Sequence, residues 1–129
     1  MRVSETLIVI IILAIFLSVL LSTSSPVTII THYADTYGVK REIPIAIALA
    51  ESNLKPDASN ASSSASGLFQ FLNGSCQYWC IDKYGITHSM EYKNYPAVQA
   101  KCAIRMLTDG HIDAWNESST TWKTLIKET

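Results

Sequence analysis

The chain has 129 residues and a formal net charge of −1 at pH 7, which leaves room for one small domain. Its lysine and arginine residues are scattered, so the sequence lacks the basic run that marks nucleic-acid binding and any polybasic patch beside a membrane segment. We therefore expect no nucleic-acid partner. We expect no cofactor either. A near-neutral surface suits an uncharged or mixed polymer.

The N-terminal segment is strongly apolar. Residues 7–21 read LIVIIILAIFLSVLL, with Arg2 before them and STSSP after them. A basic start, an apolar middle and a small, polar end are typical of a secretory signal peptide. The run is shorter than the roughly 20 residues that span a bilayer comfortably, but no clear A-x-A cleavage site follows. We predict that residues 1–24 are a signal peptide or an uncleaved membrane anchor, and that residues 25–129 are exported to the cell envelope or secreted.

Three cysteines follow that segment: Cys76, Cys80 and Cys102. Export places them in an oxidising compartment, where three cysteines allow one disulfide and leave one thiol. We predict a bridge between Cys80 and Cys102 that joins two helices, with Cys76 to Cys102 as the alternative pairing. No histidine stands at ligand spacing, so we expect no metal site.

The remaining chain is predicted to be mainly α-helical. Apolar spacing with glycine and proline signals predicts helices over 26–37, 42–53, 75–84 and 96–109, and a short helix or turn pair in the tail. No alternating strand pattern of useful length occurs. Residues 57–67 resemble a linker in composition, but they lead directly into the apolar run GLFQFL. We interpret them as an ordered active-site loop.

Glu51 is the candidate acid. On a helix its same-face neighbours are Ile47, Ala48 and Leu54, all apolar. Apolar surroundings penalise the charged form of a carboxyl group, so we expect the pKa of Glu51 to be raised. A general acid near neutral pH requires such a shift. The alternative is an ordinary glutamate at a helix end, exposed to solvent.

Two motifs on either side of the loop favour the catalytic interpretation. Glu51 and Ser52 end a helix, KPDAS follows at 55–59, and GLFQ occupies 67–70. This order resembles the catalytic (SLT-type) domain of lytic transglycosylases, in the lysozyme-like superfamily, and is similar to goose-type lysozyme. The resemblance covers about residues 26–122. It implies a small lysozyme-like helical fold with a cleft between the Glu51 helix and the GLFQ segment.

The resemblance also implies roles for single residues. Glu51 would be the catalytic acid/base, and Ser52 would support it or contact the sugar. Phe69 has core packing as an alternative, and Trp115 could either stack on a sugar ring or plug the core. The implied substrate-binding residues are Ser52, Ser59, Gly67, Leu68, Phe69, Gln70, Ser75 and Trp115.

The implied activity is cleavage of the β-1,4 bond between N-acetylmuramic acid and N-acetylglucosamine in peptidoglycan. With a single carboxylate, Glu51 would act first as acid and then as base, which leaves 1,6-anhydro ends. A hydrolytic muramidase and a non-catalytic peptidoglycan-binding module are the alternatives. The expected partner is the glycan strand, bound by a monomer, with membrane contact through residues 1–24 if they are not cleaved.

The chain departs from the family pattern near its end. Where the family has a Tyr-Asn-Ala-Gly motif whose tyrosine orients the acid, residues 109–116 read DGHIDAWN, with Trp115 at the aromatic position. Tyr92 and Tyr95 are the candidate replacements for that tyrosine. The alternative is that both tyrosines only pack at the surface.

Overall fold

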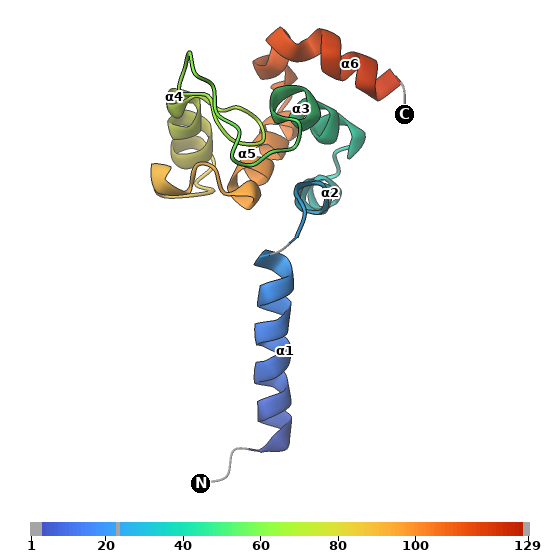
Figure 1. Cartoon of the computed structure of the whole chain (residues 1–129), viewed down its shortest axis with the longest axis vertical. Helices are drawn as coiled ribbons and strands as arrows, with labels where there is room; N and C mark the ends of the chain where they lie inside the picture. Colours follow the sequence, from blue (N-terminus) through green and yellow to red (C-terminus); the bar gives the residue numbers. More distant parts are fainter. Residues whose placement is uncertain (1–3, 23, 128–129) are drawn as a thin grey trace.

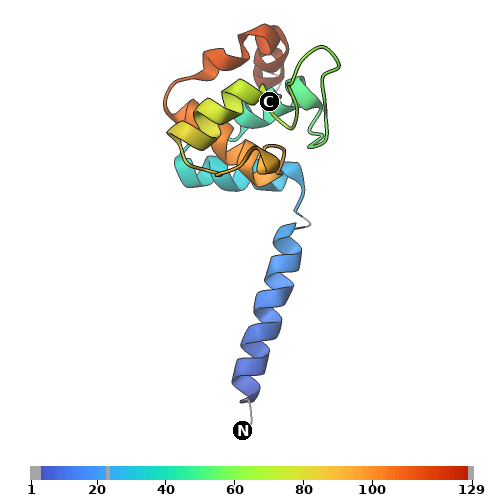
Figure 2. The same cartoon turned by 90° about the vertical axis from the view of Figure 1, so that its left-hand side faces the viewer.

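The computed structural model describes residues 4–22 and 24–127. Helix α1 (Glu5–Ser22) extends away from the other helices, which gather into one body (Figures 1 and 2). The large apolar side chains of α1 between Leu7 and Leu17 are exposed. Among the described residues, no helix combines the length and hydropathy of a membrane span. The signal or anchor role of residues 1–24 stays a prediction.

Helix α2 (Pro26–Tyr37) begins and ends at the signals that predict it. The Ser25 hydroxyl accepts a hydrogen bond from the backbone N–H of Thr28 at 3.3 Å, and Pro26 occupies the first turn, where no N–H is needed. Gly38 ends the helix in the left-handed conformation, at φ 70°. These contacts are local, so the sequence alone could place this helix.

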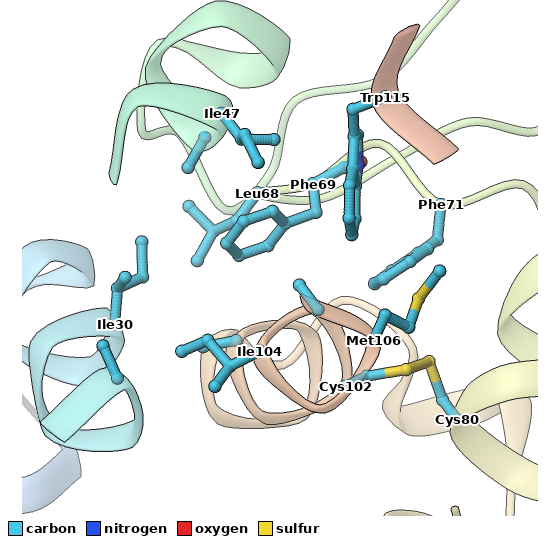
Figure 3. Packing of buried hydrophobic residues seen from close by; sticks show 14 of the residues in the cluster. Ile30, Ile47, Leu68, Phe69, Phe71, Cys80, Cys102, Ile104, Met106 and Trp115 are labelled. Atoms are coloured by element: carbon cyan, nitrogen blue, oxygen red, sulfur yellow. A yellow bond between two sulfur atoms is a disulfide. The ribbon is translucent and has the colours of Figure 1, made fainter. Parts of the chain in front are cut away.

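Helix α3 (Glu42–Ser52) carries Glu51 in its last turn. Its inner face buries Ala46, Ile47 and Ala48, and Asn53 closes the helix at φ 53°. Helix α5 (Pro96–Thr108) packs on α2 and also contacts α3, and its Ile104 and Met106 are buried. Figure 3 shows Leu68 and Phe69 lying between Ile47 of α3 and Ile104 of α5. The core therefore holds the end of α3 against the segment that follows the loop.

The segment predicted as a helix over 75–84 differs in its geometry. It forms the short α4 (Asn73–Ser75) and then η1 (Cys76–Lys83), a π-helix whose hydrogen bonds span five residues. Both Cys76 and Cys80 are buried, and spacing by four residues fits a π-helix as well as an α-helix. Periodicity over such a short segment does not separate the two.

The disulfide of the structure joins Cys80 of η1 to Cys102 of α5, with Cα atoms 5.4 Å apart. This is the first of the two pairings considered from the sequence. Cys76 is a buried free thiol. The bridge fixes η1 to the central helix (Figure 3).

The end of the chain forms two short helices. A single 3₁₀ turn, η2 (Met90–Tyr92), precedes α5. After α5 the chain continues as the 3₁₀ helix η3 (Ile112–Ser118) and then as α6 (Ser119–Lys127). Helix α6 packs along α3. The tail thereby brings η3 to the side of Glu51.

The loop after α3 is ordered, as its apolar continuation predicts. Isolated antiparallel bridges pair Ser66 with Ser59 and with Phe71, although the described residues form no continuous strand. The N–H of Gly67 donates to the Ala58 carbonyl at 2.9 Å. These bonds fold residues 58–71 into a compact unit beside the helix end.

A buried amide, Gln99 of α5, holds this unit in place. Its Oε1 accepts from the Phe69 N–H at 3.0 Å, and its Nε2 donates to the Ser66 carbonyl at 3.2 Å. Gly67 lies against the same amide at φ +84°, and a Cβ there would be 2.5 Å from Gln99 Nε2. Only glycine fits this position, because both the backbone angle and the space exclude a side chain.

We predict that Gly67→Ala lowers the free energy of unfolding by about 2–5 kcal/mol, since left-handed strain costs about 1–2 kcal/mol and overpacking about 1–3 kcal/mol. The matched control is Gly85→Ala. Gly85 is also left-handed, at φ +59°, but nothing lies within 4 Å of its added Cβ. That variant should lose only the strain, about 1–2 kcal/mol. Urea denaturation measures both losses, and equal losses would contradict the close packing of Gly67 on Gln99.

Candidate active site

An open cleft of about 740 Å³ lies beside the end of α3. Its walls come from α3, the loop after it, the segment that follows Gly67, η1, α5 and η3. The lining residues are Glu51, Asn60, Ser62, Ser63, Ala65, Phe69, Gln70, Phe71, Leu72, Ser75, Trp79, Met106, Asp113, Ala114, Trp115, Asn116 and Glu117.

Glu51 is half-buried in this cleft. Burial raises the pKa of its carboxyl group, a hydrogen bond from Ser118 opposes that rise, and the negative charge of Glu117 adds to it. The Ser118 hydroxyl donates to Glu51 Oε1 at 2.6 Å. Because the net direction is upward, a larger fraction of Glu51 is protonated near neutral pH than for an exposed glutamate.

Ser52 does not lie on the cleft wall. It is buried, and its hydroxyl donates to the backbone carbonyls of Ala48 at 3.0 Å and Leu68 at 2.8 Å. Its expected contact with the sugar is therefore not formed by this geometry. Ser52 instead connects the last turn of α3 to the GLFQ segment. This hydrogen bond holds in place the helix turn that carries Glu51.

The other expected substrate-binding residues divide into three groups. Gln70 and Ser75 line the cleft and are partly exposed, whereas Phe69 borders it but is only 1% exposed and packs in the core, which is the alternative considered for it. Gly67 and Leu68 are buried beneath the cleft, and Ser59 is exposed but does not line it. Gly67 is covered because it packs on Gln99, and Leu68 is covered because its side chain belongs to the core.

Gln70 has a positioning role as well as a place on the wall. Its backbone is left-handed, at φ 52°. Its Nε2 donates to the carbonyls of Gly67 at 2.9 Å and Ala58 at 3.1 Å. The side-chain amide therefore joins the two ends of the loop at Ala58 and Gly67. These hydrogen bonds hold Gln70 in a fixed position on the cleft wall.

Trp115 plugs the core more than it lines the cleft. Only 4% of the residue is exposed, and its ring packs against Phe69 and Phe71, each with ring centroids 6.0 Å away. Its Nε1 donates to the Phe69 carbonyl at 3.1 Å. A ring that is covered on its faces cannot stack on a sugar, so the expected stacking contact of Trp115 is not available.

Trp79 is the aromatic side chain that the cleft offers instead. It lies in η1, is half-buried, and stacks on Tyr84 with ring centroids 5.9 Å apart. The sequence did not single it out, because a tryptophan in a helix that holds two buried cysteines fits the core equally well. Exposure at the cleft depends on the tertiary arrangement of η1 and η3.

The structure adds three polar residues that sequence reasoning missed. Ser118 donates a hydrogen bond to the Glu51 carboxyl group, and Asp113 and Glu117 line the cleft together with Glu51. They stand 62 to 67 positions after Glu51, and no motif in the sequence links them to it. Tyr92 and Tyr95, the expected replacements for an orienting tyrosine, pack edge to face at 5.1 Å and are not among the lining residues.

Within residues 4–22 and 24–127, no group of three His, Cys, Asp or Glu side chains is placed to hold a metal ion. Among the described residues, the side chains that line the cleft carry hydroxyl groups, amides, aromatic rings and three carboxyl groups.

A helical domain with an open cleft and one half-buried glutamate at a helix end has the architecture of the lysozyme-like superfamily. The family model described as the transglycosylase SLT domain matches residues 28–123. The chain therefore belongs to the SLT family, whose members are lytic transglycosylases that act on peptidoglycan outside the cytoplasm. No curated protein and no solved structure matches the chain.

We predict that Trp79→Ala weakens binding of a soluble peptidoglycan fragment by about fivefold, the equivalent of about 1 kcal/mol, because a partly exposed ring at the cleft is lost. Isothermal titration calorimetry measures this change. The matched control is Tyr95→Ala, since Tyr95 is 57% exposed and lies outside the cleft. Unchanged affinity in the Trp79 variant would remove Trp79 from the binding surface.

Proposed function

We propose that the chain is a peptidoglycan lytic transglycosylase in which Glu51 alone transfers protons at the bond between N-acetylmuramic acid and N-acetylglucosamine. The supporting observation is the half-buried carboxyl group of Glu51 on the wall of an open cleft, with its pKa raised by burial. An open cleft suits a polymer such as a polysaccharide, and a raised pKa suits a proton donor.

In the first step, protonated Glu51 gives its proton to the glycosidic oxygen. The bond between that oxygen and C1 of N-acetylmuramic acid breaks, and positive charge develops at C1. The acetamido group of the same sugar stabilises this charge. Glu51 is left as a carboxylate, in a site where burial disfavours the charged form.

In the second step, the Glu51 carboxylate removes the proton of the C6 hydroxyl group. The C6 oxygen then bonds to C1, which closes the 1,6-anhydro ring. The proton lost in the first step is regained in the second, so Glu51 returns to its protonated form and no water is consumed. The burial that raises the pKa of Glu51 favours this return.

Export of the domain is part of the proposal. Peptidoglycan lies outside the cytoplasmic membrane, so the domain has to cross that membrane to reach its substrate. Residues 1–24 carry the order of features that directs such transport. They would act either as a cleaved signal or as an anchor that holds the domain at the membrane surface.

We predict that Glu51→Gln slows the clearing of purified cell walls by at least about a hundredfold, because the amide cannot transfer the proton. Turbidity measures the rate. Glu91→Gln, at an exposed glutamate of η2 away from the cleft, is the control and should clear at the wild-type rate. Equal clearing by the Glu51 variant would contradict the proposal, and clearing by neither variant nor wild type would favour a binding module.

Hydrolysis is the second candidate, and Glu117 is the observation that favours it. Glu117 lines the same cleft, and its charge acts on the Glu51 carboxyl group. A second carboxylate in reach of the sugar is what glycosidases use to activate water. Under that mechanism the products would carry reducing ends rather than anhydro rings.

Mass spectrometry of the released fragments separates the two outcomes, because anhydro ends are lighter by one water, about 18 Da. We predict anhydro ends from wild type and from Glu117→Gln alike. We also predict that Glu117→Gln moves the alkaline limb of the pH–rate profile to lower pH, since removing the charge of Glu117 lowers the pKa of Glu51. Reducing ends that disappear in the Glu117 variant would establish hydrolysis instead.

A further inference from the structure

We propose that Ser118 positions Glu51 for both proton transfers by occupying one carboxyl oxygen, Oε1, and leaving the acid proton on the other. This inference rests on the proposed function of Glu51 and adds a residue that the family resemblance does not supply. Ser118 ends η3, far along the chain from Glu51. It does not line the cleft, so it acts through Glu51 and not on the substrate.

The Ser118 hydroxyl has two possible acceptors. Its Oγ lies 2.6 Å from Glu51 Oε1 and 3.2 Å from the backbone carbonyl of Trp115. That carbonyl already accepts a hydrogen bond from Trp122 Nε1 at 3.0 Å. The shorter contact has the length expected when a hydroxyl donates to a carboxylate.

A hydroxyl group has one hydrogen to donate, and this favours the proton on Oε2. If the Glu51 proton sat on Oε1, it would donate to Ser118 Oγ. Ser118 would then have to turn its hydrogen to the Trp115 carbonyl, which is farther away, at 3.2 Å, and which it would share with Trp122. With the proton on Oε2, Ser118 keeps its short bond to Oε1 in both protonation states. No described residue hydrogen-bonds to Oε2.

The consequence is that a single oxygen performs both steps. Oε2 delivers the proton to the glycosidic oxygen, and the same atom then takes the proton of the C6 hydroxyl. The carboxyl group does not need to rotate between the steps, because Ser118 holds Oε1 throughout. Such preorganisation matters because a small misplacement of the proton donor costs much of the rate.

The bond also sets the acidity of Glu51. Ser118 opposes the upward shift that burial causes, whereas the charge of Glu117 in η3 increases it. Asp113 of η3 is the other acidic group on the cleft wall, and no lysine or arginine lines it. Removal of the Ser118 hydroxyl therefore raises the pKa of Glu51 further.

The test is Ser118→Ala in the full chain, assayed on purified peptidoglycan over a range of pH. We expect kcat to fall about tenfold to a hundredfold, as for loss of a hydrogen bond to a charged group, with KM nearly unchanged. We also expect the alkaline limb of the pH–rate profile to move to higher pH. Ser119→Ala, the same change at the next residue, should leave kcat and the limb at their wild-type values.

A pair of equal-sized variants keeps the test decisive if the alanine variant does not fold. Ser118→Thr retains the hydroxyl and should stay within a few-fold of wild type, whereas Ser118→Val lacks it and should behave as Ser118→Ala is expected to. Equal kcat and an equal pH limb in the threonine and valine variants would overturn the proposal. Loss of activity with an unmoved limb would also overturn it, because it would mark a structural role only.

The outcome is separable from that of the proposed function. If Glu51→Gln is inactive while Ser118→Ala matches wild type, Glu51 is the acid but Ser118 does not position it. If Glu51→Gln is fully active, the assignment of Glu51 itself fails, and the role of Ser118 fails with it.

Discussion

The half-buried carboxyl group of Glu51 is the constraint on which the site depends. An ionised carboxylate loses hydration when it is buried, so the protonated form gains relative to the charged one. The Ser118 hydroxyl offsets part of that penalty at Oε1. A proton donor that must also become a base needs both effects, because too little burial leaves it ionised and too much prevents it from ionising at all.

The remaining architecture keeps this carboxyl group in place. Ser52 fixes the last turn of α3 to the Leu68 carbonyl, and Gln99 fixes the Phe69 N–H to α5. Trp115 joins the same network because its Nε1 donates to the Phe69 carbonyl. The backbone carbonyl of Trp115 in turn accepts a hydrogen bond from Trp122 Nε1 of α6. Three distant segments thus meet through buried backbone groups, each satisfied by a side chain. The GLFQ segment therefore connects α3, α5 and η3 beneath the cleft, and it also forms part of the cleft wall.

The sequence predicted what depends on local signals. The Ser-Pro start and glycine end of α2, the helix that carries Glu51 and the ordered loop after it all follow from neighbouring residues. The motifs around Glu51 also indicated the family that the SLT match shows. The resemblance implied that Gln70 and Ser75 face the cleft, and both line it, whereas Phe69 borders the cleft but packs in the core.

What the sequence could not predict depends on contacts between distant segments. Ser118 lies 67 positions from Glu51, and a serine in a polar stretch gives no sign of its partner. Trp115 and Trp79 are chemically alike, and only the packing of η3 on Phe69 and Phe71 decides that the first is covered and the second reaches the cleft. The resemblance implied that Ser52 supports Glu51 or contacts the sugar, and only the fold, which turns its hydroxyl toward the Leu68 carbonyl, favours the supporting role.

The most direct test of the central claim is a measurement of the protonation of Glu51 itself. A ¹³C NMR titration of glutamate side-chain carboxyl groups in the full chain, with the Glu51 signal assigned from its absence in the glutamine variant, gives that pKa. A midpoint clearly above that of the exposed glutamates is the predicted result. A midpoint equal to theirs or below it would show that the cleft does not hold a proton donor at this position, and would contradict the account.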